Sequence, residues 1–185
     1  MEIIKEGYIR VSDIIGIYQN YASVPREKLR KSQEIGTVIH DAIENFYKHK
    51  FVPIPPSMDG YFRSFIKWIS AQELEGNLVP VPQIIEERFY CPKLMITGRV
   101  DLVTRINDSN VLVDFKTGSW AHPKIWQLQA TFYRYLIPEE FKPDHFIFLQ
   151  LDREGEMPTP HMFEYSPDKW EVCEAALKAY HYFKS

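Results

Sequence analysis

Two carboxylates and one ammonium interrupt apolar sequence between residues 97 and 118. Asp101 lies in the run TGRVDLV, and Asp114 and Lys116 lie in the run VLVDFKTG. Two buried carboxylates that lie close together repel each other and favour protonation, whereas a divalent cation between them removes that cost. Because carboxylates are hard oxygen ligands, this pattern indicates Mg²⁺ or Mn²⁺ rather than zinc.

Asp114 and Lys116 are two residues apart, so on a β-strand their side chains emerge on the same side. With a metal bound, such a site would offer a Lewis acid for a phosphate group and a water made acidic by the cation. Lys116 would orient that water or neutralise the charge that develops. These are the requirements of phosphodiester hydrolysis, although an Asp-x-Lys pair by itself is also the pattern of an ordinary ion pair.

The sequence around these groups predicts the strands that position them. Three β-rich runs, at 83–90, 94–106 and 110–116, are separated by turn-type residues and are expected to form adjacent antiparallel strands. Another apolar run, HFIFLQL at 145–151, predicts a buried strand. Asp101 and Asp114 therefore fall on neighbouring strands, and we expect them to converge.

Helical periodicity marks the segments on either side of these strands. The run QEIGTVIHDAIENFYKH at 33–49 spaces its apolar residues as a helix does and leaves His40 on the neighbouring face. By itself, His40 could be a core-edge histidine bonded to Glu44. Further helix starts are predicted at Ser12, Ser57, Pro123 and Ser166. The helix from Ser57 should stop around Gly76 and Asn77.

The helix that Pro123 opens carries a second polar pair. Its inward positions are expected to be Ile125, Leu128, Phe132 and Leu136. Gln129 and Tyr133, one helical turn apart, lie with Trp126 on an adjoining face. Without further context, this pair could simply be a half-buried helix face.

Length, composition and charge limit the class of protein. The chain has 185 residues, of which 45% are hydrophobic, and a net charge of −3, which predicts one packed domain over residues 1–185. This charge does not indicate a nucleic-acid binder, so any basic surface must be local. The charged amino terminus and the lack of a long apolar run predict a cytoplasmic protein that does not cross a membrane.

The densest basic run and two tryptophans could add nucleic-acid contacts. The run contains Arg26, Lys28, Arg30 and Lys31. It could be a solvated helix or loop face, or it could contact DNA. Trp120 and Trp126 flank the region of Lys116 and Gln129 and could stack on unpaired bases, although Trp126 could equally pack in the core.

Taken together and in this order, the motifs resemble the PD-(D/E)XK nuclease superfamily, and more narrowly its RecB-like exonuclease branch. Asp101 follows GRV, the DFK motif stands at 114–116, and QATFY stands at 129–133. GTVIH supplies the upstream helical histidine of that branch as His40. The resemblance covers roughly residues 36–133, and its strength lies in the ordered set rather than in any single motif.

The resemblance implies an α/β fold with a restriction-endonuclease-like core, in which α-helices flank both faces of a mixed central β-sheet. A sheet of about four or five strands is expected. It also implies roles for the candidate site residues. The metal ligands would be His40, Asp101, Asp114 and the carbonyl of Phe115. Asp101, Asp114 and Lys116 would be catalytic, with Lys116 as the catalytic lysine.

The same resemblance assigns two further roles. Gln129 and Tyr133 would contact the DNA backbone, or steady Lys116 and the scissile phosphate. The family often has a glutamate on the strand before the G-x-x-D motif. Glu86 and Glu87 both fit loosely, and because their side chains point opposite ways on a strand, the choice between them stays open.

The activity that the resemblance implies is a Mg²⁺- or Mn²⁺-dependent deoxyribonuclease, most simply an exonuclease acting on single strands or duplex ends in DNA repair, recombination or replication processing. Many RecB-like nucleases hold an iron–sulfur cluster on four cysteines. Cys91 and Cys173 are too few for such a cluster, so a cluster-free member is expected. The alternatives are a nuclease-fold module that binds DNA or protein without cutting, and a structure-specific endonuclease.

Overall fold

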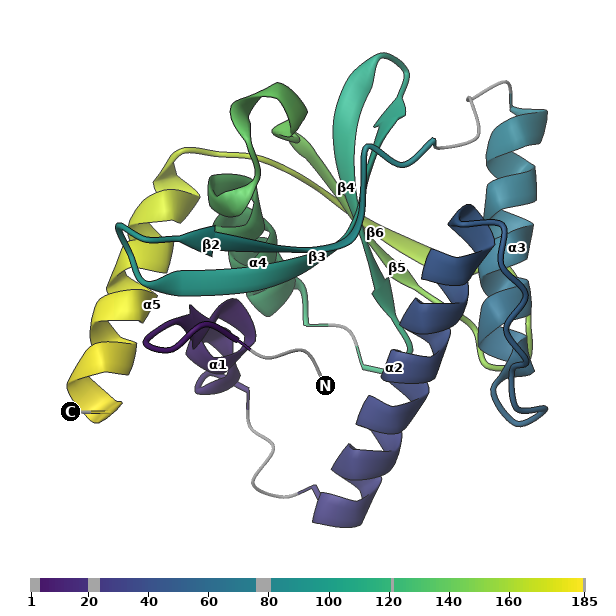
Figure 1. Ribbon diagram of the computed structural model, residues 1–185, viewed down its shortest axis with the longest axis horizontal. Coiled ribbons are helices and arrows are strands. Elements are labelled where there is room, and N and C mark those ends of the chain that lie inside the picture. Colours follow the sequence, from purple (N-terminus) through teal and green to yellow (C-terminus); the bar gives the residue numbers. More distant parts are fainter. Residues whose placement is uncertain (1–3, 20–23, 76–80, 121, 185) are drawn as a thin grey trace.

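A mixed β-sheet with helices on both faces forms the protein (Figure 1). The computed structural model describes residues 4–19, 24–75, 81–120 and 122–184. Within these residues the sheet has six strands in the order β1-β3-β4-β5-β6, and β2 also pairs with β3. The predicted fold class is confirmed, with more strands than the four or five expected.

The strands that carry the acids pair as predicted. The six strands are β1 Ile9–Arg10, β2 Ile84–Cys91, β3 Ile96–Ile106, β4 Ser109–Lys116, β5 His145–Gln150 and β6 Thr159–Glu164. β2, β3 and β4 form two adjacent antiparallel pairs, while β4 and β5 are parallel. The β3–β4 ladder ends at the pair Leu102 and Val113. Beyond that pair the two strands separate, and the next residue on each is an aspartate.

Two apolar cores hold the helices against the sheet. The helices are α1 Val11–Gly16, α2 Arg26–Tyr47, α3 Asp59–Leu74, α4 Pro123–Leu136 and α5 Asp168–Lys184, with a 3₁₀ turn at Glu139–Phe141. α2 and α3 cover one face through Ile39, Ile43 and Phe65, and α1, α4 and α5 cover the other. The helices α2 and α4 lie on opposite faces of the sheet (Figure 1), and from them His40 contacts Asp101 and Gln129 contacts Asp114.

Some boundaries differ from the sequence-based expectations. α2 begins at Arg26 and so includes the basic run, and α1 begins at Val11, so Ser12 is not its cap. β1 and β6 were not predicted, because β1 has two residues and β6 is an edge strand that contains Pro160. The predicted stop at Gly76 and Asn77 lies outside the described residues.

Helix α4 is buried over a wider face than its periodicity predicted. Phe132 and Leu136 are buried as expected, but Trp126, Ala130 and Tyr133 are buried as well. α4 packs between the sheet and α5, so more of its circumference is covered than a helix on an open surface would have. Within the described part of the chain, no helix has the length and apolar character that a membrane crossing requires.

Candidate active site

The site lies where β3 and β4 separate. Asp101 is 7% exposed and Asp114 is 1% exposed, so both carboxyl groups are taken out of water. The carboxylate of Asp101 bridges the opening, because its Oδ2 accepts a hydrogen bond of 2.9 Å from the backbone N–H of Phe115. The separation of the strands thus frees one backbone donor, and Asp101 uses it to fix its own position.

His40 reaches Asp101 from helix α2 and joins a second acid there. Its Nδ1 lies 2.8 Å from Glu86 Oε1 and 3.5 Å from Asp101 Oδ2. Its Nε2 lies 3.1 Å from the carbonyl oxygen of Phe115. We call His40, Glu86 and Asp101 the imidazole cluster; one ligand atom from each lies within 4.8 Å of the others, so together they could hold a metal ion.

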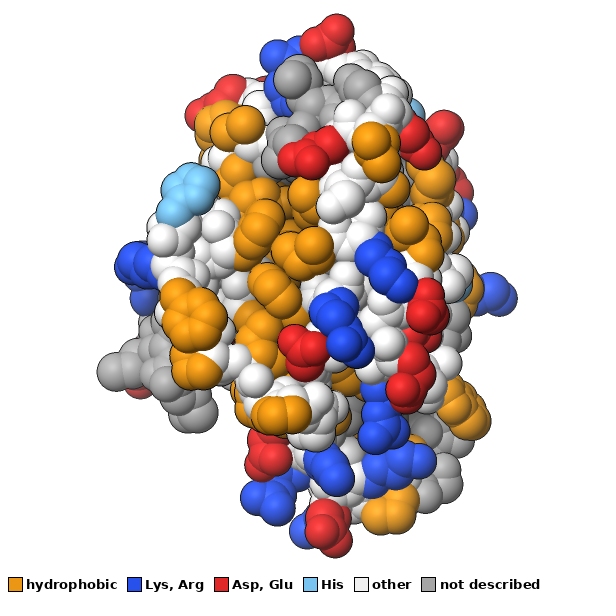
Figure 2. Space-filling view, turned by 90° about the vertical axis from the view of Figure 1, so that its right-hand side faces the viewer, with side chains coloured by type: hydrophobic (Ala, Val, Ile, Leu, Met, Phe, Trp, Pro, Cys, Tyr) orange, Lys and Arg blue, Asp and Glu red, His pale blue; other side chains and the backbone are white. Residues whose placement is uncertain are grey.

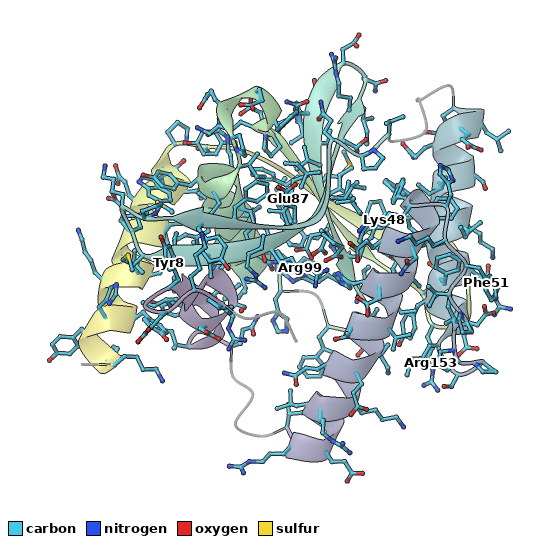
Figure 3. All side chains as sticks on the ribbon, in the orientation of Figure 1. Tyr8, Lys48, Phe51, Glu87, Arg99 and Arg153 are labelled. Atoms are coloured by element: carbon cyan, nitrogen blue, oxygen red, sulfur yellow. The ribbon has the colours of Figure 1, made fainter. Side chains whose placement is uncertain are left out.

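The structure distinguishes Glu86 from Glu87, which the sequence left open. The Glu86 side chain is 3% exposed and faces His40, whereas Glu87 is exposed (Figure 3). Glu86 has a φ of +46°, and the β2–β3 ladder skips its pairing with Asp101. Strict strand alternation could not predict this, because a left-handed residue turns its side chain out of the alternating pattern.

Arg99 holds Glu86 in this unusual conformation. Its Nε donates to the Glu86 carbonyl oxygen at 3.1 Å and lies 2.9 Å from Glu86 Oε2. Figure 3 shows Arg99 between the β2–β3 ribbon and α2, where its guanidinium also lies 3.7 Å from Glu44 Oε2. Glu44 therefore pairs with Arg99 and with Lys48 rather than with His40.

A second group forms around the other aspartate. We call Asp114, Lys116 and Gln129 the lysine cluster. The Lys116 ammonium forms an ion pair with Asp114 Oδ1 and donates to Gln129 Oε1 at 3.2 Å. Gln129 Nε2 donates to Asp114 Oδ2 at 2.6 Å. Asp114 Oδ1 faces the ammonium but has no hydrogen bond of acceptable geometry, so a buried carboxylate oxygen retains capacity for another partner.

Tyr133 supports the lysine cluster from behind. Its ring is 7% exposed and packs on Gly98, where a Cβ would come within 2.7 Å of the ring. Burial raises the pKa of the Tyr133 phenol, and the charges of Asp114 and Asp101 raise it further, so the hydroxyl stays neutral. In this arrangement Gln129 contacts Lys116 directly, and Tyr133 lies next to Gln129.

The protons in the site are set by burial and by the crowded acids. Burial lowers the pKa of His40, but the charges of Asp101 and Glu86 outweigh that effect and raise it well above its ordinary value. Burial raises the pKa of Asp114 to about 7, and the charge of Asp101 adds to the shift. For Glu86 the same two causes, burial first, raise the pKa.

Asp101 behaves differently from the other two acids. Burial alone would raise its pKa, but the neighbouring His40 and Lys116 and the Phe115 N–H outweigh it, so the pKa is lowered. These shifts favour the protonated forms of His40, Glu86 and Asp114. A bound cation would displace such protons, since metal ligands must be deprotonated.

Most of the predicted site residues meet, in two groups. Asp101, His40 and the Phe115 carbonyl lie together, and Glu86 completes that group. Asp114 stands beside it, but its oxygens face Lys116 and Gln129. One imidazole nitrogen and two carboxylates are a donor set that fits a divalent cation.

The two tryptophans differ in their surroundings. Trp126 is buried and stacks on Phe148 with 5.3 Å between the ring centroids. Trp120 follows Lys116 by four residues in the chain and is 78% exposed. Trp126 is therefore a core residue, whereas Trp120 is accessible to solvent.

Comparisons with known proteins agree with this geometry. A family model of the PD-(D/E)XK nuclease superfamily matches residues 60–179, which include both aspartates, Lys116 and Gln129. A candidate exonuclease from Eubacterium rectale has a similar solved structure, with 10% identity, a TM-score of 0.54, and coverage of 97% of this chain and 84% of that one.

Two other solved structures are more distant. The protein SSO0001 shows 14% identity and a TM-score of 0.45, covering 100% of this chain and 80% of its own. LHK-Exo in complex with dAMP shows 11% identity and a TM-score of 0.40, with 94% and 86% covered. No curated protein sequence matches the chain at a significant level.

Proposed function

Because the chain belongs to the PD-(D/E)XK nuclease superfamily, we propose that it is a metal-dependent deoxyribonuclease that hydrolyses phosphodiester bonds. The observation that carries the proposal is the meeting of the imidazole cluster and the lysine cluster where β3 and β4 separate. Hydrolysis of a phosphodiester needs ligands for a cation and a positive charge near the phosphate, and the two clusters supply one each.

The imidazole cluster is proposed to hold Mg²⁺ or Mn²⁺. His40, Asp101 and Glu86 would be its ligands, with the Phe115 carbonyl and Asp114 at the border of the site. When bound, the cation would supply a Lewis acid for the phosphate and lower the pKa of a water. Asp114 Oδ1 is buried and, apart from its ion pair with Lys116, accepts no hydrogen bond from the described residues, so it could also face a cation.

Lys116 is proposed as the residue that acts on the phosphate. Its ammonium is held by Asp114 and Gln129, so its position is fixed before substrate arrives. From there it would orient the attacking water and neutralise negative charge as the phosphorus–oxygen bond breaks. Gln129 and Tyr133 would act by holding Lys116 in place and by bordering the DNA backbone.

An exonuclease mode is the finer part of the proposal. The fold is shared with the candidate exonuclease from Eubacterium rectale, and the RecB-like order of motifs supports the same mode. The proposed substrates are single strands or duplex ends of DNA, and the proposed setting is DNA repair, recombination or replication processing.

Product analysis tests the activity and its mode together. DNA labelled at the 5′ or 3′ end, as single strand and as duplex, would be incubated with Mn²⁺, with Mg²⁺ and with EDTA. We expect stepwise short products with either metal and none in EDTA. Discrete internal fragments would show an endonuclease instead. Wild-type protein no more active than its Lys116→Ala variant, yet still retaining DNA, would indicate a binding module and contradict the proposal.

A further inference from the structure

A groove opens at the carboxyl end of β4, between the amino-terminal half of α2 and the loop that joins β5 to β6. Its volume is about 680 Å³. Thr117 and Gly118 form part of its wall and follow Lys116 directly, so the groove begins where the candidate active site ends. That wall is fixed, because Leu151 N donates to the Lys116 carbonyl at 2.8 Å and Gln150 Nε2 donates to the Gly118 carbonyl at 2.7 Å.

Helix α2 runs from His40 of the imidazole cluster into this groove. Lys28, Lys31 and Ile35 line it and are spaced three and four residues apart, which places them along one side of the helix. Gly36 comes next, and a Cβ there would lie 3.8 Å from Thr117 Oγ1, so the helix runs close to the wall. From His40 back to Lys28 the helix rises about 18 Å, or roughly five phosphate steps of a B-form strand.

The groove is positively charged although the chain as a whole is negative. Its charged lining residues are Lys28, Lys31 and Arg153 against the single acid Asp152, whereas the net charge of the chain is −3. Figure 2 shows Lys and Arg side chains gathered at the lower end of the face, the end where α2 begins in Figure 1. Figure 3 places Arg153 beside the lower parts of α2 and α3.

These three cations are free to bind an anion. Lys28, Lys31 and Arg153 are exposed, and none of them forms an ion pair with another residue that the structure describes. The one acid is already engaged, because Asp152 Oδ1 accepts the backbone N–H of Glu154 at 2.9 Å and that of Glu156 at 3.0 Å. Asp152 therefore shapes the loop and offsets only one of the three positive charges, so the charged lining residues sum to +2.

We propose that this groove holds a single DNA strand and delivers it to Lys116; the choice of occupant rests on the proposed nuclease function. Its phosphates would lie on Lys28, Lys31 and Arg153. Ile35, Met58 and Tyr61 also line the groove and offer an apolar surface to sugars and bases. A volume of about 680 Å³ lies in the range of clefts for small ligands, so the groove would hold a short stretch of one strand at a time.

Binding measured without cleavage tests this proposal. The probe is a 5′-fluorescein oligothymidylate of about twelve nucleotides, titrated in EDTA and followed by fluorescence anisotropy. For the double variant K28Q/K31Q we expect binding about tenfold weaker than wild type, and a salt dependence reduced by about 1.4 in the slope of log K against log salt. The matched control is K93Q/K178Q, which removes two exposed lysines outside the groove lining and should bind within about twofold of wild type.

A second variant tests the path without changing charge. Ser32 is exposed and lines the groove, so Ser32→Leu, which adds bulk without an aromatic ring that could stack on a base, should narrow it and weaken binding while the melting temperature stays close to that of wild type. Equal binding by the two double lysine variants, unaltered binding by Ser32→Leu, or equal competition by a duplex of the same length would each overturn the proposal. Since no cleavage is measured, loss of groove binding and failure of the nuclease activity are separate results.

Discussion

The two aspartates at the separation of β3 and β4 are buried side by side but are neutralised in different ways. Asp101 belongs to the imidazole cluster, where the compensating charge sits on His40 and can be lost as a proton. Asp114 belongs to the lysine cluster, where the compensating charge is the permanent ammonium of Lys116. A cation can displace a proton from an imidazole far more readily than it can displace an ammonium that is fixed to its own chain.

Because of this difference, the two acids are suited to two separate tasks. The imidazole cluster is suited to exchange its proton for a metal ion. The lysine cluster is suited to keep a positive charge in place whether or not a metal ion is bound. Gln129 helps to hold it there, because it bonds both the Asp114 carboxylate and the Lys116 ammonium. A variant that disturbs one cluster should therefore leave the other preserved.

The largest effect is expected from Lys116→Ala. Loss of the ammonium should lower the rate of DNA cleavage by about 10²–10³-fold, because the charge that develops on the phosphate is no longer compensated. Manganese affinity, measured by calorimetry, should change little, since the imidazole cluster is intact. Lys178→Ala, an exposed site on α5, is the matched control. A loss of manganese binding as large as the loss of rate would show that the clusters are not separate.

The variant Glu86→Gln disturbs the imidazole cluster instead. Its control is Glu87→Gln, the same change at the next residue. Glu86 is buried beside His40, whereas Glu87 is exposed. The same substitution is therefore made once inside the imidazole cluster and once at the surface. Manganese affinity should fall by about 10–100-fold for the first variant and stay unchanged for the second. Equal affinities in calorimetry would remove Glu86 from the metal site.

The pH dependence of stability should report on Asp114. Its ordinary pKa is 3.8 and burial raises it to about 7, so the metal-free folded protein holds a proton that the unfolded chain releases. The stability from this group is present below pH 4 and is lost as the pH rises through 7.

Thermal melts in EDTA between pH 5 and 8 measure this loss. The wild-type melting temperature should fall by several degrees relative to Asp114→Asn, which keeps a neutral side chain at every pH. The residual slope in the variant comes from His40 and Glu86, whose pKa values are also raised. Parallel curves for the two proteins would contradict the shift at Asp114.

The smallest effect is expected from Gly98→Ala. The new Cβ would press on the Tyr133 ring, which supports the lysine cluster, and should lower the free energy of unfolding by about 1–3 kcal/mol. Cleavage should slow while manganese affinity holds. Gly16→Ala is the control, because a Cβ there meets no atom within 4 Å. Gly98→Ala with unchanged stability and rate would show that Tyr133 does not position Lys116.

Periodicity and turn chemistry predicted the parts of the site that depend on neighbours in the chain. The alternation from 83 to 116 placed Asp101 and Asp114 on adjacent antiparallel strands, and the 3.6-residue repeat placed His40 and Gln129 on helices. These features are local, because a strand or helix fixes the direction of its side chains by its own geometry.

Features that depend on distant packing could not be predicted in this way. β6 is an edge strand whose residues are all exposed or half-buried, and the wide buried face of α4 exists because α5 covers it. The choice of Glu86 over Glu87 depends on a left-handed φ that Arg99 holds from the next strand.

The sequence by itself determined which groups could do chemistry and on which elements they stand. The tertiary structure decided how these groups are paired: His40 with Glu86 and Asp101, and Lys116 with Asp114 and Gln129. The reason is that the β3–β4 ladder ends at Leu102 and Val113, and the two buried acids just beyond it are within reach of helices that cover opposite faces of the sheet. Partners at such a point are chosen by distance and desolvation, and neither is encoded in the spacing of residues along the chain.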